Sequence, residues 1–156
     1  AAPAQSALDA LEAGLTGWAG SYGASPTIAR VSGVAQDGTW SIRVTATSAT
    51  ATGAGFNDNP RWVLSTVAGK PYTASAWVKA GAVGQRLIVQ LREWNGSTLV
   101  STVRGEWVAT DTTWHQLSAV LTAAGSGRNL SMAVFAANLA APASFHADSL
   151  SLTSPN

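Results

Sequence analysis

Trp77, in the segment 69–81, is the most informative side chain of this sequence for ligand binding. Trp77 stands between Ser75 and Lys79 at strand-like alternation, so the three side chains share one side of a sheet. A large indole is costly to leave in water, and its flat face suits a hydroxyl-rich ligand such as a sugar ring. The alternative is that a loop or a second sheet covers Trp77.

Further side chains could join Trp77 if their strands belong to the same sheet. Amide and guanidinium groups exchange directional hydrogen bonds with ring hydroxyls, and aromatic faces accept the apolar C–H side of a sugar. We therefore expect one binding surface, with Trp107 at its rim. Its residues are Trp77, Lys79, Gln90, Arg92, Trp94, Phe135 and Trp107.

Other aromatic and polar residues receive different interpretations. Trp18, Trp40 and Trp114 are expected in the core or at its margin. The polar loop from Asn57 to Trp62 could form a wall of the binding surface. Loops rich in Asn and Asp are more often turn chemistry alone.

The composition excludes several classes of protein. Charged residues make up 11% of the 156, against about 25% in soluble proteins generally. The formal net charge of +1 is spread over isolated Lys and Arg residues, without the basic stripe of a nucleic-acid binder. No stretch approaches the roughly 20 apolar residues of a membrane-spanning helix, and no amphipathic run carries a cationic face. We expect a monomer with no nucleic-acid or membrane partner.

The absence of cysteine excludes disulfides, thiolate zinc sites and cysteine nucleophiles. The first residues, AAPAQSA, have the small-residue and proline character of a mature N-terminus left by signal-peptide cleavage. We therefore expect a secreted, extracellular protein. The length fits a single domain over residues 1–156, with tails at 1–6 and 154–156.

Alternation of polar and apolar residues predicts an all-β fold. The Asn95-Gly96 pair predicts a tight hairpin between two strands, and the short spacing of turn signals is typical of a sandwich. Leu8, Leu11 and Leu15 recur at helical spacing, so an initial helical turn is one option for the N-terminus. Strands are predicted over residues 40–46, 72–79, 87–94, 97–103, 107–108, 114–122, 130–136 and 145–153.

Five segments follow one another in an order that carries a family resemblance. They are LEAGLTGW at 11–18, DGTWSIRV at 37–44, AGKPYTASAWVKAG at 68–81, TTWHQLSAVLT at 112–122 and FHADSLSLT at 145–153. Together they resemble the carbohydrate-binding modules of the family 4, 9 and 22 type, which are appended to secreted bacterial glycan-degrading enzymes. The resemblance implies a jelly-roll β-sandwich of two antiparallel sheets. One face would cup a polysaccharide chain, without catalysis, and the partner would be an attached catalytic module.

The same resemblance implies a structural calcium ion. The family holds it with a Glu near the first strand, backbone carbonyls in a turn, and an Asp in the last strand. Glu12, Gly38, Trp40 and Asp148 stand at those positions, and calcium accepts six to eight such oxygen ligands. The alternative is that Glu12 is a solvated surface acid and Asp148 a hydrogen-bond acceptor beside a turn.

The polysaccharide is expected to be neutral, with β-glucan, xylan or mannan preferred, because the sequence shows no basic cluster that would attract a strongly anionic polymer. One alternative function is a structural or adhesive β-sandwich, in which a neighbouring module covers Trp77 and Trp94. Another is a small jelly-roll polysaccharide lyase or hydrolase. A hydrolase needs two carboxylates roughly 5 to 10 Å apart, and Glu93 and Glu106 form the only plausible mid-strand pair.

Overall fold

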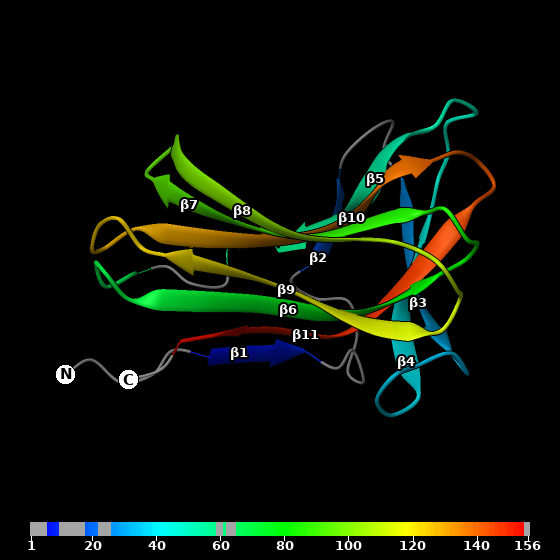
Figure 1. The fold of residues 1–156 in the computed structure, drawn as a ribbon, viewed down its shortest axis with the longest axis horizontal. Coiled ribbons are helices and arrows are strands. Elements are labelled where there is room, and N and C mark those ends of the chain that lie inside the picture. Colours follow the sequence, from blue (N-terminus) through cyan, green and yellow to red (C-terminus); the bar gives the residue numbers. More distant parts are fainter. Residues whose placement is uncertain (1–5, 10–17, 22–25, 59–60, 62–64, 155–156) are drawn as a thin grey trace.

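The computed structural model describes residues 6–9, 18–21, 26–58, 61 and 65–154, and all regular structure within them is β-strand (Figure 1). Those residues contain no helix long and apolar enough to cross a membrane. The strands are β1 (Ser6–Asp9), β2 (Trp18–Ser21), β3 (Thr27–Ser32), β4 (Trp40–Thr45), β5 (Thr52–Asp58), β6 (Pro71–Ala80), β7 (Arg86–Asn95), β8 (Thr98–Val108), β9 (Trp114–Thr122), β10 (Asn129–Leu139) and β11 (Ser144–Thr153).

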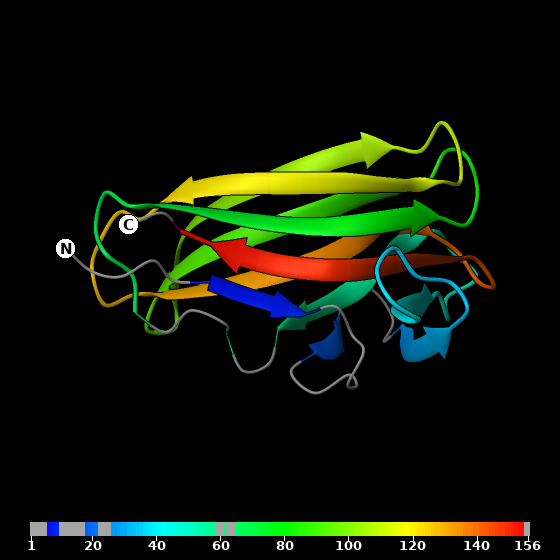
Figure 2. The same cartoon turned by 90° about the horizontal axis from the view of Figure 1, so that it is seen from below.

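The strands form two antiparallel sheets that pack face to face. Sheet A has the order β3-β4-β11-β6-β9, and β1 also pairs with β11. Sheet B has the order β2-β5-β10-β7-β8. Figure 2 shows sheet A as the nearer layer, with β1 beside β11 and β6 beside β9. The all-β fold predicted from the sequence, a jelly-roll β-sandwich of two antiparallel sheets, is confirmed.

The core lies between the inner faces of the two sheets. In β6, Tyr72, Ala74, Ala76 and Val78 are fully buried, while the side chains between them are partly exposed. The same alternation in β7 and β10 supplies Leu87, Val89, Leu91, Leu130, Met132 and Val134 to one continuous hydrophobic cluster. Burial of this apolar surface is the main stabilising contribution to the fold.

One edge of the sandwich is closed by β8 of sheet B, which lies against β9 of sheet A. A Cβ atom at Gly105 would stand 2.0 Å from the carbonyl oxygen of Ser118, so only glycine permits this approach. Close by, the ring of Trp107 stacks on that of His115 with 4.0 Å between centroids. These contacts fix the position of β8 relative to sheet A.

Several elements differ from the sequence predictions. β8 is one strand across the two segments 97–103 and 107–108 that were predicted separately, and β2, β3 and β5 were not predicted. Leu8 lies in a strand and not in a helical turn, whereas Leu11 and Leu15 lie outside the described residues. Ser154, expected in a tail, is buried and donates from Oγ to the carbonyl oxygen of Pro71 at 2.8 Å.

Candidate functional site

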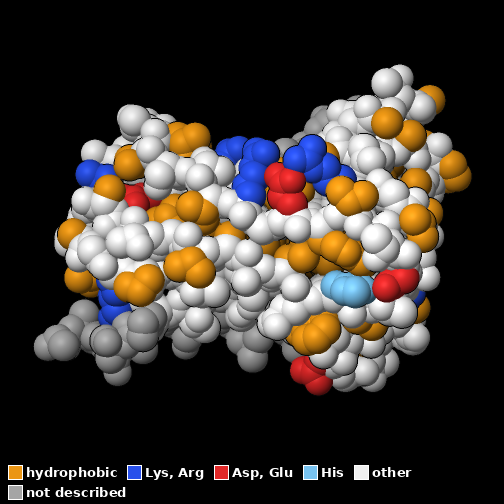
Figure 3. All heavy atoms as spheres, in the orientation of Figure 1, with side chains coloured by type: hydrophobic (Ala, Val, Ile, Leu, Met, Phe, Trp, Pro, Cys, Tyr) orange, Lys and Arg blue, Asp and Glu red, His pale blue; other side chains and the backbone are white. Residues whose placement is uncertain are grey.

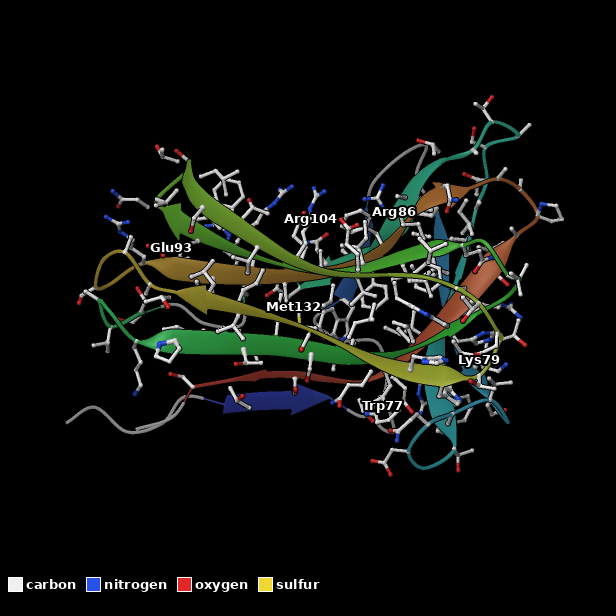
Figure 4. All side chains as sticks on the ribbon, viewed as in Figure 1. Trp77, Lys79, Arg86, Glu93, Arg104 and Met132 are labelled. Carbon is white, nitrogen blue, oxygen red and sulfur yellow. The ribbon has the colours of Figure 1, made fainter. Side chains whose placement is uncertain are left out.

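The predicted binding surface is divided between the two sheets. Trp77 and Lys79 lie on β6 of sheet A, whereas Trp94 lies on β7 of sheet B. All three project outward, so they point to opposite sides of the sandwich, and Figure 4 shows Trp77 on the side away from Arg104 of β8. The expectation that Trp77 and Trp94 lie side by side is therefore wrong. Alternation indicates which side chains point outward, but it does not indicate which strands share a sheet.

Trp107 was expected at the rim of the binding surface and lies on the inner side of β8. It stands opposite Leu87 in the ladder and packs against the core cluster. The cause is a bulge near the hairpin, where Trp94 pairs with Leu99 but Glu93 pairs with Ser101. One extra residue in a strand moves every later side chain to the other face.

The other tryptophans are distributed between core and surface. Trp18 is buried in the core and meets Phe56 edge to face, with 5.4 Å between ring centroids. Trp40 is half-buried, with the guanidinium carbon of Arg30 3.7 Å from its ring centroid. Trp114 pairs with Lys79 and shares the outer side of sheet A with it, so its expected place in the core or at its margin is corrected.

The outer face of sheet B is hollowed. The hollow has a volume of about 300 Å³, and in Figure 3 the upper surface dips between two raised ends at the point where Lys and Arg side chains gather. The register sets Ala133 of β10 opposite both Gln90 of β7 and Asn57 of β5, which brings three strands to one surface. The hollow is lined by Asn57, Asp58, Arg61, Gln90, Arg92, Trp94, Ser131 and Ala133.

Trp94 is the aromatic side chain of this hollow. Its indole nitrogen donates a hydrogen bond to Ser131 Oγ at 3.0 Å. The guanidinium carbon of Arg61 lies 4.6 Å from its ring centroid, and Arg61 also donates to the carbonyl oxygen of Gly96 at 3.3 Å. The half-buried indole is thus held from two sides while part of it remains in contact with solvent.

Gln90 and Phe135 both face the outer side of sheet B, and of the two Gln90 lines the hollow. Gln90 is buried, and its Oε1 accepts a hydrogen bond from Arg104 Nε at 2.8 Å. Phe135 is 6% exposed and packs with Ile88 and Ala133 in a small hydrophobic cluster of its own. Phe135 therefore offers little ring area to a ligand, and the guanidinium carbon of Arg104 lies 5.6 Å from its ring centroid.

Three residues at this surface are not among the site residues predicted from the sequence, and for each the structure shows why the sequence did not indicate it. Arg104 would face the core if the hairpin register continued without the bulge, because it would then pair with Val89 instead of Gln90. Ser131 and Ala133 carry no chemical signal of their own and reach the hollow only through pairing with β7. The loop predicted as a wall does supply Asn57, Asp58 and Arg61, while Asn59 and Trp62 lie outside the described residues.

The acidic residues are placed apart from one another. Glu93 is buried on the inner face of sheet B, where it accepts hydrogen bonds from Ala124 N at 2.9 Å and Arg128 Nη1 at 2.9 Å. Glu106 lies on the outer face and accepts from Arg86 Nε at 3.1 Å. The two carboxylates therefore stand on opposite faces of one sheet. Among the described residues, Asp58 is the only acid that lines the hollow.

The two histidines belong to sheet A, away from the hollow. His115 contacts Asp111 at 2.9 Å, and hydrogen bonds from Thr113 and His115 lower the pKa of Asp111 to about 2. His146 is half-buried, and burial together with the charges of Arg43 and Lys79 lowers its pKa. Neither histidine is placed to act on a ligand at sheet B.

Asp148, the predicted calcium ligand of the last strand, lies beneath the loop before β4. Its Oδ2 accepts hydrogen bonds from the backbone N–H groups of Gln36 and Asp37, both at 2.9 Å, and its Oδ1 accepts from Ser149 N at 2.7 Å. Burial raises the pKa of Asp148, and these N–H groups partly oppose that shift.

The backbone of Gln36 and Asp37, next to the Gly38 turn, therefore contacts Asp148, and the calcium ion stays a prediction. Trp40 begins β4 directly after that turn. Glu12 lies outside the described residues, within which no group of three or more His, Cys, Asp or Glu side chains could hold a metal. The described part of the site thus supplies one carboxylate with spare lone pairs on Oδ1 and a neighbouring loop.

Comparison with known proteins relates the chain to carbohydrate-binding modules. Its structure superimposes with a TM-score of 0.72 and 17% identity on the CBM22-1–GH10 modules of a Clostridium thermocellum endo-1,4-β-D-xylanase complexed with xylohexaose, covering 96% of this chain and 28% of that one. The CBM22-2 xylan-binding domain of Paenibacillus barcinonensis superimposes with a TM-score of 0.68 and 15% identity, covering 96% of this chain and 98% of that one. A Stig cyclase from Fischerella superimposes with a TM-score of 0.63 and 12% identity, covering 89% of this chain and 85% of that one. At these identities the likeness shows a shared fold.

The sequence comparison goes further than the structural one. No curated protein matches the chain. Residues 9–144 match the sequence family described as a carbohydrate binding domain of the CBM 4/9 type. The match spans most of the 156 residues, and this chain therefore belongs to that family of carbohydrate-binding domains.

Proposed function

We propose that this domain binds a polysaccharide chain across the hollow outer face of sheet B and so keeps an attached glycan-active enzyme near its substrate. The observation that carries the proposal is the half-buried indole of Trp94, held by Ser131 and Arg61 in a hollow lined with hydrogen-bonding side chains. A sugar ring can stack on such a face while its hydroxyls bond to the amides and guanidinium groups around it. Xylan is the first polymer to test, because solved relatives in fold are described as xylan-binding.

The domain acts in this proposal without catalysis. Hydrolysis of a glycosidic bond requires two carboxyl groups about 5 to 10 Å apart on either side of the bond. Glu93 is enclosed in the core and paired with Arg128, while Glu106 is on the outer face and paired with Arg86. A chain lying in the hollow would meet Asp58 alone among the described acids.

Affinity electrophoresis in gels containing xylan, β-glucan or mannan tests the proposal. Wild-type protein should be retarded by at least one polymer, and Trp94→Ala should lose about tenfold in affinity, which is roughly 1.4 kcal/mol of stacking. Trp77→Ala is the matched control, because that indole lies on sheet A. Unchanged retardation of Trp94→Ala, or an equal loss in Trp77→Ala, would contradict the assignment to sheet B. Release of reducing sugars would indicate catalysis, and inertness towards these polymers and towards acidic polysaccharides would indicate an adhesive domain.

We also propose that a calcium ion joins Asp148 to the Gly38 turn, with Glu12 and backbone oxygens of the turn and of Trp40 completing its ligands. A cation beside the buried carboxylate would offset the burial that raises the pKa of Asp148. An ion bound only by the folded state raises apparent stability. Chelation should therefore lower the melting temperature of wild type and leave that of Asp148→Asn unchanged, and equal melting of wild type with and without chelator would exclude the ion.

We propose in addition that the protein is extracellular and monomeric. A polysaccharide-binding face is useful where the polymer is, outside the cell. Recovery of the native protein from culture supernatant without lysis, at the hydrodynamic radius of a single chain, is the expected result. Recovery from the cytosol alone would contradict it.

A further inference from the structure

Arginine side chains gather on the outer face of sheet B. The chain has nine Lys and Arg residues in 156, and four of them project from this face. Figure 4 labels two, Arg86 and Arg104, at the upper surface where Figure 3 shows the blue side chains. The four are Arg61, Arg86, Arg92 and Arg104.

The acids on this face do not balance that charge. Arg86 forms an ion pair with Glu106, which leaves Arg61, Arg92 and Arg104. Asp58 is the only carboxylate among the described residues that lines the hollow with them. The hollow therefore keeps an excess of positive charge in a protein that is otherwise poor in charged residues.

Arg61 and Arg92 are half-buried, whereas Arg104 is exposed and is tethered by a hydrogen bond. Arg104 is fixed through its Nε to Gln90, and Arg61 lies over Trp94. The Nε of Arg92 is buried and has no hydrogen-bond acceptor among the described residues. A buried donor without an acceptor is unfavourable, so Arg92 keeps hydrogen-bonding capacity that the described residues do not use.

A carboxylate is the acceptor that best matches a guanidinium group, because two parallel N–H···O bonds form with opposite charges. A neutral sugar needs no such charge, and Asn57 and Ser131 at the hollow could already serve its hydroxyls. Arginines placed only for solubility need no partners in the fold, whereas Arg61 lies over an indole and Arg104 is hydrogen-bonded to a buried amide.

We propose that the polysaccharide bound by this face carries carboxylate groups, as uronic acid residues do, and that Arg92 and Arg104 recognise them beside a sugar stacked on Trp94. This inference rests on the proposed function of sheet B. It replaces the expectation of a neutral polymer, which depended on the linear spacing of the basic residues. Antiparallel pairing brings Arg104 next to Gln90, and Arg92 is two residues further along β7 on the same face.

The test compares a polysaccharide with its own carboxyl-reduced form, in which each uronic acid has become a neutral sugar. Glucuronoxylan and polygalacturonate are used as two such pairs, in affinity electrophoresis and calorimetry. Wild type should bind at least one native polymer about tenfold more tightly than its reduced form, with a preference that declines as salt increases. Equal binding of native and reduced forms, or tighter binding of the reduced form, would overturn this inference and leave the proposed function standing. No binding to any form would count against the proposed function itself.

Variants assign the effect to the arginines. Arg92→Gln and Arg104→Gln should lose much more affinity for the native polymer than for the reduced polymer, so that most of the preference for the native form disappears. Arg43→Gln is the matched control, because Arg43 lies on sheet A opposite His146. An equal loss of affinity for both polymer forms, or the same loss in Arg43→Gln, would refute recognition by Arg92 and Arg104. Thermal unfolding of each variant verifies that the fold is retained.

Discussion

Replacing Gly105 by alanine should destabilise the sandwich and weaken polysaccharide binding at the same time. The new Cβ would stand 2.0 Å from the carbonyl oxygen of Ser118, 2.9 Å from its carbonyl carbon and 3.3 Å from its nitrogen. An ordinary contact between carbon and oxygen is about 3.3 Å or longer, so β8 and β9 must separate by about 1 Å. The atoms in the way are backbone atoms of a paired strand, which cannot rotate aside as a side chain would.

The expected cost follows from that displacement. Overpacking typically costs about 1 to 3 kcal/mol, and the rigid neighbours at Gly105 put this variant at the upper end. Alanine also restricts the unfolded chain, which offsets about 0.5 to 1 kcal/mol. The net loss should be about 2 kcal/mol, or roughly 4 to 8 °C in melting temperature for a chain of this size.

Urea denaturation of the purified domain gives the free energy of unfolding directly. Gly69→Ala is the control, since Gly69 has φ 79° and no atom within 4 Å of the position that an alanine methyl group would take, so only backbone strain of about 1 kcal/mol is expected there. Arg104 precedes Gly105 on the opposite face of β8. Displacement of the strand should therefore also weaken polysaccharide binding under conditions in which the variant is still folded. A Gly105→Ala variant within about 0.5 kcal/mol of wild type would refute the reasoning.

Three further substitutions test other parts of the fold. Glu93→Ala leaves Arg128 unpaired and should cost about 3 kcal/mol, the lower end for a buried pair, because the Arg128 side chain is 24% exposed; a loss under about 1 kcal/mol by urea denaturation would contradict this. Trp18→Ala should cost about 3 to 5 kcal/mol through lost core packing, and melting at the wild-type temperature would contradict it. His146 has a lowered pKa, so the unfolded chain takes up the proton first and stability should fall as pH drops below about 6.5. His146→Gln should reduce that slope in melting scans, and an identical pH profile would exclude His146 as its source.

The strands that alternate cleanly could be predicted from the sequence. Tyr72 and Val78 point into the core while Trp77 points outward, as the alternation of polar and apolar residues indicates. β2, β3 and β5 are short or rich in small residues, and their segments lack that pattern. Their place in the sheets depends on pairing with distant strands, which local sequence does not encode.

The candidate site was harder to predict because it depends on strand order and on one bulge. Trp77 and Trp94 satisfy the same local rule, yet β6 and β7 are consecutive strands that belong to different sheets. The register shift between Glu93 and Trp94 then reverses the facing of Trp107 and Arg104 together. A single inserted residue thus moved an indole into the margin of the core and a guanidinium group onto the ligand face.

β7 joins the stability of the fold to the chemistry of the hollow. Leu91 and Glu93 point inward and are buried, whereas Gln90, Arg92 and Trp94 alternate with them on the outer face. Because the inner side chains are packed against both sheets, the strand cannot slide by one residue without burying Arg92 and exposing Leu91. Core packing therefore fixes the spacing between the indole and the guanidinium group without any contact from the ligand. A site positioned in this way loses little conformational entropy on binding, so substitutions at its outward positions should change affinity far more than stability.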